Sequence, residues 1–179
     1  MNKSNSFTYK DGALFCESVK LSELPDLIPK SEYGVTTPIY VYSKKQLIEN
    51  IRAYKNGFGD RKNLVGFSMK ANPNTEILKL VLGEGLSIVA VSGFEIRLAI
   101  DLGFSGSRIF FNGNGKQEWE MRLAVERECV MNVDSVFNAV QLVKLVEELG
   151  KEVEVLLRMN IDIETNVHPY LNTGMLKLS

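Results

Sequence analysis

The sequence predicts an α/β fold of the (β/α)8 barrel type, incomplete, with about five strands. Short apolar runs recur at spacings of roughly 20 to 25 residues, which is the length of one strand plus one helix. The runs are almost wholly apolar, as in parallel strands that are covered on both faces. A doubly wound open sheet fits the same pattern, but the even spacing without a reversal favours the barrel. A full barrel needs eight units and about 250 residues, so we expect these 179 residues to hold only part of one.

The first 35 residues do not share this repeat. Residues 7–20 are predicted to form a hairpin, because Asp11 and Gly12 stand between two apolar runs and Asp-Gly is a strong hairpin signal. A two-stranded hairpin is marginally stable by itself, so we expect it to pack against something else. We therefore expect residues 1–35 to be an N-terminal β segment and residues 36–179 to be the first part of the barrel.

The barrel portion is expected to open with a short strand at residues 39–42 and a helix over residues 44–58 that begins behind Ser43. Five further strands follow from the apolar runs, at residues 64–69, 88–92, 108–112, 130–133 and 153–159. Four amphipathic stretches between these strands predict helices at residues 75–82, 95–102, 116–127 and 136–149.

Caps and stops support the helix assignments. Ser92 with Glu95 forms a capping-box pattern, and Ser135 is a predicted N-cap. Gly103 and Gly150 stand where helices are expected to stop. Helical spacing also predicts a set of core side chains, namely Leu47, Ile51, Tyr54, Trp119, Phe137, Val140, Val143 and Val146.

Composition excludes several classes of protein. The chain is 45% apolar and 24% charged, which is near the globular average. Its 21 basic and 22 acidic residues give a net charge of −1, which argues against nucleic acid or an anionic membrane as a partner. No apolar run approaches the roughly 18 residues that span a bilayer, and the polar start lacks a signal-peptide core. With two cysteines far apart in sequence, we expect a reduced, cytoplasmic setting.

Lys70 is the strongest candidate for chemistry. It follows the first barrel strand in GFSMKANPN, and the carboxyl ends of barrel strands are where catalytic groups sit. Apolar walls would disfavour its ammonium form and leave more free amine for covalent chemistry with a carbonyl group. A solvated lysine at a strand end is the structural alternative.

Two other candidates stand on the same expected rim. Arg158 lies within the fifth apolar run, where a charge is expected to be paired or to face the polar mouth of the barrel. The segment 112–116 (NGNGK) lacks the spacing of a phosphate loop and is interpreted as a tight turn, with ligand contact as a second possibility. His168 is the only histidine, so we predict no metal site around it.

Taken together, the motifs resemble a family. The sequence resembles the pyridoxal-phosphate-dependent decarboxylases with an alanine-racemase-like barrel, and within them the diaminopimelate branch. The resemblance runs in family order through TPIYVYS (37–43), MKANPN (69–74), VSGFE (91–95), FNGNGK (111–116), NVDS (132–135), LRMN (157–160) and HPY (168–170). It covers nearly the whole chain, and the HPY element points to the diaminopimelate branch.

This resemblance implies a function and a cofactor. Lys70 would hold pyridoxal 5′-phosphate covalently, and the cofactor would act as electron sink during decarboxylation of meso-diaminopimelate to lysine. Arg158 would lie near the cofactor. Members of the family are head-to-tail homodimers, and the hairpin would belong to a C-terminal β domain that is missing here.

The sequence also departs from the family pattern, and we expect this to affect activity. Val89 stands where many relatives have an aspartate, and Phe94 replaces a smaller residue. The phosphate loop, the ring partners and the substrate-reading residues of the family are missing, so we expect the chain alone to be inactive. The alternative hypothesis is a non-catalytic, decarboxylase-like protein that binds a partner or an intact enzyme subunit.

Overall fold

The computed structural model describes residues 6–30, 34 and 36–159. These residues divide into two compact units, Met1–Asn63 and Leu64–Ser179. The expected domain boundary between residues 35 and 36 stays a prediction. No helix in the described residues is long and apolar enough to cross a membrane.

The first unit contains a small antiparallel sheet in the order β1-β2-β3. Its strands are β1 (Phe7–Lys10), β2 (Ala13–Cys16) and β3 (Val19–Lys20). The hairpin prediction is confirmed: Asp11 and Gly12 form the turn with φ values of 49° and 77°. The third strand extends the predicted hairpin into a sheet.

Helical segments complete this unit. A turn of 3₁₀ helix (Leu21–Glu23) and the short α1 (Leu24–Leu27) follow the sheet, and α2 spans Lys44–Asn56. Ser43 caps α2 as predicted by accepting a hydrogen bond from the Gln46 N–H at 3.0 Å. The Glu17 carboxylate joins sheet to helix by accepting from the Ser43 hydroxyl at 2.7 Å and from the Lys45 N–H at 3.1 Å. These hydrogen bonds lower the pKa of Glu17.

Two expectations for this unit are wrong. Residues 39–42 form no strand, because no other strand among the described residues lies beside them to complete a ladder. Tyr40 is 92% exposed there. The helix α2 buries none of its residues, and Tyr54 is 65% exposed on it.

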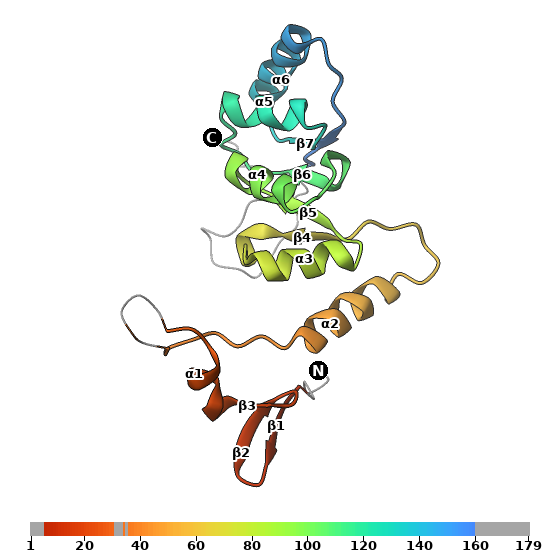
Figure 1. Cartoon of the computed structure of the whole chain (residues 1–179). Helices are drawn as coiled ribbons and strands as arrows, with labels where there is room; N and C mark the ends of the chain where they lie inside the picture. The colour runs from red at the N-terminus through yellow and green to blue at the C-terminus, as the bar shows by residue number, and fades with distance from the viewer. Residues whose placement is uncertain (1–5, 31–33, 35, 160–179) are drawn as a thin grey trace, which may run out of the picture. The chain divides into compact units, whose positions relative to one another are not determined.

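The second unit is a five-stranded parallel sheet in the order β4-β5-β6-β7-β8. The strands are β4 (Gly66–Ser68), β5 (Ser87–Ala90), β6 (Ile109–Phe111), β7 (Val130–Val133) and β8 (Val155–Leu157). The helices between them are α3 (Thr75–Gly83), α4 (Gly93–Asp101), α5 (Glu118–Glu126) and α6 (Val136–Leu149). Figure 1 shows helices and strands following one another in sequence order. All five predicted strands and four predicted helices of the repeat are present.

Helices cover one face of this sheet. Residues of one strand parity are fully buried against them, among them Met69, Ile88, Ala90, Ile109, Phe111 and Met131. Neighbouring helices α4, α5 and α6 also contact one another, which places them in one layer. A doubly wound sheet would carry helices on both faces, so this arrangement is that of part of a (β/α)8 barrel.

The predicted caps are present, but the buried side of α6 differs from the prediction. Ser92 and Ser135 accept from the N–H groups of Glu95 and Asn138, and Gly150 ends α6 in the left-handed conformation at φ 60°. The side chains of Asn138, Leu142 and Leu145 are buried on α6. Three of the four side chains predicted to be inward are exposed, with Phe137 at 73%, Val140 at 49% and Val143 at 52%, and the fourth, Val146, is half-buried. Trp119 on α5 is also 40% exposed.

Candidate functional site

The candidate site lies at the carboxyl ends of the parallel strands, on the sheet face that the helices leave uncovered. We call this the open face. Strand register assigns Ser68, Val89, Phe110, Asn132 and Leu156 to it, because side chains alternate between faces along a strand. None of these five residues is fully buried. Carboxyl ends of parallel strands are the usual position of ligands in such folds.

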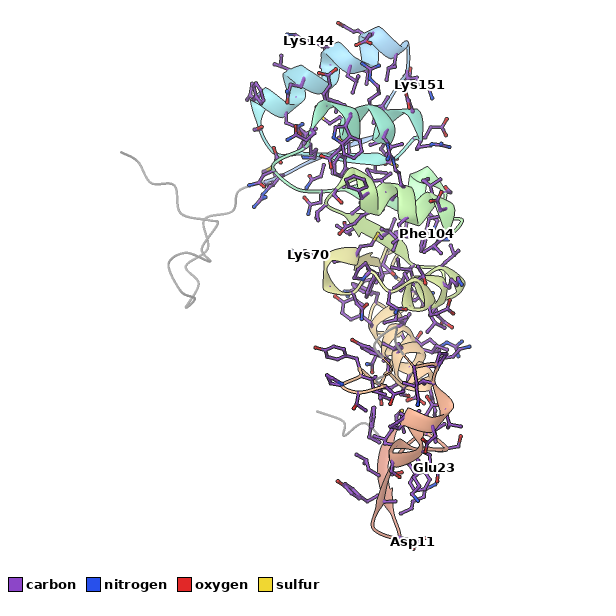
Figure 2. All side chains as sticks on the ribbon, turned by 60° about the vertical axis from the view of Figure 1, so that its left-hand side comes forward. Asp11, Glu23, Lys70, Phe104, Lys144 and Lys151 are labelled. Carbon is purple, nitrogen blue, oxygen red and sulfur yellow. The ribbon has the colours of Figure 1, made fainter. Side chains whose placement is uncertain are left out.

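Lys70 stands at the carboxyl end of β4, in a turn of 3₁₀ helix over Met69–Ala71 (Figure 2). Met69 is completely buried and anchors this turn, whereas Lys70 next to it is exposed. The following loop is also fixed, because Asn72 accepts from the Asn74 N–H at 3.1 Å and Asn74 caps α3. The turn therefore presents a primary amine at a defined place on the rim.

The apolar walls expected around Lys70 are not found in the described residues. Its side chain is exposed, because β4 is an edge strand of the described sheet and only β5 flanks it. These residues therefore do not shield the Lys70 ammonium group from water. The expectation of apolar walls is wrong for the described residues.

Arg158 follows β8 directly. Its N–H donates to the Val133 carbonyl oxygen at 2.8 Å, which extends the ladder by one residue and assigns Arg158 to the open face, two residues after Leu156. Its side chain is exposed. Three strands separate β8 from β4, so Lys70 and Arg158 lie on the same rim but on opposite edges of the described sheet.

Two asparagines occupy the strands between them. The Asn132 amide Nδ2 donates to Asn112 Oδ1 at 2.6 Å, and the same oxygen accepts from the Gly113 N–H at 2.8 Å. Asn112 directly follows β6, and Asn132 lies in β7 with its neighbours Met131 and Val133 buried on the other face. Sequence reasoning did not single out this pair, although one polar residue interrupting an apolar strand was the available signal.

Lys116, from the segment 112–116, is held by neighbouring protein groups. Its ammonium contacts Asp134 at 3.1 Å and Asn138 at 3.3 Å and donates to the Gly113 carbonyl. Its side chain is 2% exposed and that of Asp134 is 10% exposed. A hollow of about 370 Å³ borders this pair between the start of α5 and the start of α6. The interpretation of this segment as a structural turn agrees with these contacts.

Glu120 is a buried carboxylate that sequence reasoning missed. One of its oxygens accepts from the Gly93 N–H at 2.7 Å and the other from the Gln117 N–H at 2.8 Å. It thereby ties the first turn of α4 to the N-cap of α5. A Cβ at residue 93 would lie 2.5 Å from the Trp119 ring, so the close approach requires Gly93. The Gln117-x-x-Glu120 spacing was a weak capping-box signal.

Other candidates contribute no reactive group to the described site. Burial raises the pKa of the Cys129 thiol to about 11, so it stays protonated and a poor nucleophile near neutral pH. His168, together with residues 160–179, lies outside the described residues. The described residues contain no group of three or more potential metal ligands among histidine, cysteine, aspartate and glutamate side chains.

Comparisons with known proteins identify the family that this chain matches. The family model described as "Pyridoxal-dependent decarboxylase, pyridoxal binding domain" matches residues 44–178. The probable chloroplastic diaminopimelate decarboxylase of Oryza sativa is 40% identical over 164 residues, which are 92% of this chain and 32% of that protein. Diaminopimelate decarboxylase of Aquifex aeolicus is 40% identical over 172 residues, 94% of this chain and 38% of that protein.

The fold of this chain is also found in solved structures. Diaminopimelate decarboxylase from M. jannaschii, solved in co-complex with L-lysine, superposes with a TM-score of 0.80 at 29% identity. The match covers 97% of this chain and 40% of that one. The chain thus spans about a third to two-fifths of the length of the relatives it matches.

Proposed function

Because the chain belongs to the pyridoxal-dependent decarboxylases, with a match to their pyridoxal-binding domain, we propose that it is part of an enzyme that decarboxylates meso-diaminopimelate to lysine. The substrate is proposed from the relatives, which are diaminopimelate decarboxylases at up to 40% identity. The cofactor is proposed to be pyridoxal 5′-phosphate, and the whole protein is proposed to be a cytoplasmic homodimer by the resemblance to its family.

One observation carries the proposal: the rim presents an exposed lysine at the end of β4, directly beside a fully buried methionine. A primary amine in this position meets the basic requirement for covalent attachment to an aldehyde. The residues present fit pyridoxal phosphate in part. They supply the amine and polar side chains on an open face, whereas the described residues alone do not enclose it.

Two side chains have proposed roles. Lys70 would hold the cofactor through Nζ, and the anchored turn would limit where that nitrogen can go. Arg158 would offer a permanent cation on the same face, suited to a carboxylate or phosphate oxygen. When bound, pyridoxal phosphate supplies the electron sink that decarboxylation requires. The sheet fixes the spacing of these side chains, which is the contribution of the protein.

The test is borohydride trapping after incubation with pyridoxal phosphate. Condensation of an amine with the aldehyde releases water, and borohydride then delivers a hydride that makes the C–N bond permanent. Peptide mass spectrometry measures the fraction of label at each lysine. We expect label at Lys70 to exceed that at any other lysine.

Two variants serve as controls. Lys70→Ala removes the proposed site, and Lys79→Ala removes an exposed lysine of α3 that pairs with Glu76. Total label is expected to fall in Lys70→Ala and to stay close to that of the unchanged chain in Lys79→Ala. Equal labelling of all lysines would count against the proposed cofactor site.

A further inference from the structure

We infer that Asn112 and Asn132 form a hydrogen-bonding pair that positions the cofactor beside Lys70, with the Asn112 amide Nδ2 as the donor. This inference rests on the proposed function, because it concerns the same open face. It begins with the two hydrogen bonds that converge on Asn112 Oδ1, from the Gly113 N–H at 2.8 Å and from Asn132 Nδ2 at 2.6 Å.

These two bonds fix the orientation of both amides. A backbone N–H can only donate, so the group that Asn112 turns toward Gly113 must be its oxygen. That oxygen can accept from Asn132 only through Nδ2. The orientation of Asn132 therefore follows from that of Asn112. The backbone of the 112–116 segment therefore fixes the orientation of both side-chain amides without a bound ligand.

The fixed orientation leaves specific groups for a ligand. The two N–H groups of Asn112 Nδ2 and the Asn132 carbonyl oxygen take no part in the bonds inside the pair. Both residues are part-buried. A pair of amide donors suits an anionic or carbonyl oxygen.

The position of the pair points to the cofactor. Strands lie about 4.8 Å apart in a sheet, so β6 lies roughly 10 Å from β4, across β5 alone. At the carboxyl end of β5 the side chains on this face are apolar, with Val89 in the strand and Val91 just beyond it, whereas the polar Ser87 on the same face is buried at the amino end of the strand. Asn112 is therefore the nearest side chain with hydrogen-bonding groups that a ligand held on Lys70 meets across β5. The oxygen it contacts is either the phenolic oxygen carried by the pyridine ring or an oxygen of the phosphate group of the cofactor.

The substitution Asn112→Asp separates the two roles of this residue. A carboxylate at residue 112 still accepts from Gly113 and Asn132, and accepts more strongly because it is charged. The group facing the ligand changes from a donor to an anionic acceptor. We expect an unchanged melting temperature and a fall of about tenfold in the trapped label at Lys70, the size of effect from losing a hydrogen bond to a charged group.

Asn114→Asp is the matched control, because it adds the same charge in the same segment on an exposed residue outside the pair. Trapping is measured with pyridoxal phosphate and with pyridoxal. A loss with both compounds assigns the contact to the ring, and a loss with pyridoxal phosphate alone assigns it to the phosphate. Either result supports the inference if Asn114→Asp labels Lys70 as well as the unchanged chain does.

Three results would overturn the inference. If the unchanged chain and Asn112→Asp carried equal selective label at Lys70, the pair would not contact the cofactor. The proposed function would still stand. An equal loss of label in Asn114→Asp would show that an added negative charge in this segment causes the loss, wherever it is placed. No selective label in the unchanged chain would overturn the proposed cofactor site, and this inference with it.

Discussion

At the scale of single residues, the rim separates side chains that hold the fold from side chains offered to a ligand. Lys70 and Lys116 both follow a strand, yet Lys70 is exposed and Lys116 is 2% exposed. Lys116 also lies 5.8 Å from the centre of the Phe111 ring, a cation–π distance. The ion pair of Lys116 with Asp134 therefore belongs to the framework of the rim.

This assignment predicts the effect of breaking the pair. Asp134→Ala leaves the Lys116 ammonium buried without its carboxylate, and we expect the free energy of unfolding to fall by about 3 kcal/mol. The double variant Lys116→Met with Asp134→Leu replaces both charges with apolar groups and is expected to recover most of that loss. Urea unfolding followed by circular dichroism measures both. A double variant as unstable as Asp134→Ala would contradict the role of the pair.

Residue-level reasoning from sequence located Lys70 and Arg158 on the rim, because Lys70 directly follows an apolar run and Arg158 is a charge within one. It missed the Asn112–Asn132 pair, since a contact between side chains 20 residues apart needs the register of two strands. It also gave Lys70 apolar walls, which depend on what flanks an edge strand. Sequence pattern predicts the position of such side chains along a strand, while their surroundings are set by tertiary packing.

At the scale of helices and strands, one carboxylate connects consecutive units of the repeat. Glu120 lies in the first turn of α5 and is 8% exposed, with both oxygens accepting backbone N–H groups at helix starts. A buried carboxylate with both oxygens bonded also suits the positive end of a helix dipole. The starts of α4 and α5 are thus held together beside the rim.

The loss of this connection has an expected size. Glu120→Ala removes two charge-assisted hydrogen bonds and leaves two N–H groups without their carboxylate, so we expect a destabilisation of about 3 kcal/mol. Glu118→Ala is the control, because Glu118 lies in the same turn but is 77% exposed and pairs only loosely with Arg122 at 3.7 Å. That change is expected to cost under about 0.5 kcal/mol. Thermal unfolding of the two variants side by side tests the difference, and equal losses would reject it.

The positions of the helices and strands were the most predictable feature of the structure. Serine caps, glycine stops and apolar runs are local signals, and each helix and strand of the repeat appeared where they indicated. The buried face of α6 was not predictable in this way. Its apolar residues are not confined to one narrow stripe, so helical spacing alone allows the stripe through Phe137 as well as the stripe through Leu142 and Leu145, and neighbouring helices decide between them.

At the scale of the whole second unit, the described sheet has two edges, β4 and β8. The strand β8 leaves its side chains exposed, with Val155 at 43%, Leu156 at 46% and Leu157 at 71%. An edge strand with unpaired backbone groups and apolar side chains is a template for pairing with another chain. This exposed edge, more than any surface helix, is expected to control how the chain behaves in solution.

We therefore expect the chain to self-associate through β8, in proportion to its concentration. Leu157→Lys places a charge on that edge and is expected to weaken association by about tenfold, which corresponds to about 1.4 kcal/mol. Leu27→Lys is the matched control, because Leu27 is 66% exposed on α1 of the first unit and is not a residue of the parallel sheet. Sedimentation velocity over a concentration series measures both variants. If Leu27→Lys reduced association as much as Leu157→Lys, general surface hydrophobicity would explain the association and the edge of β8 would not.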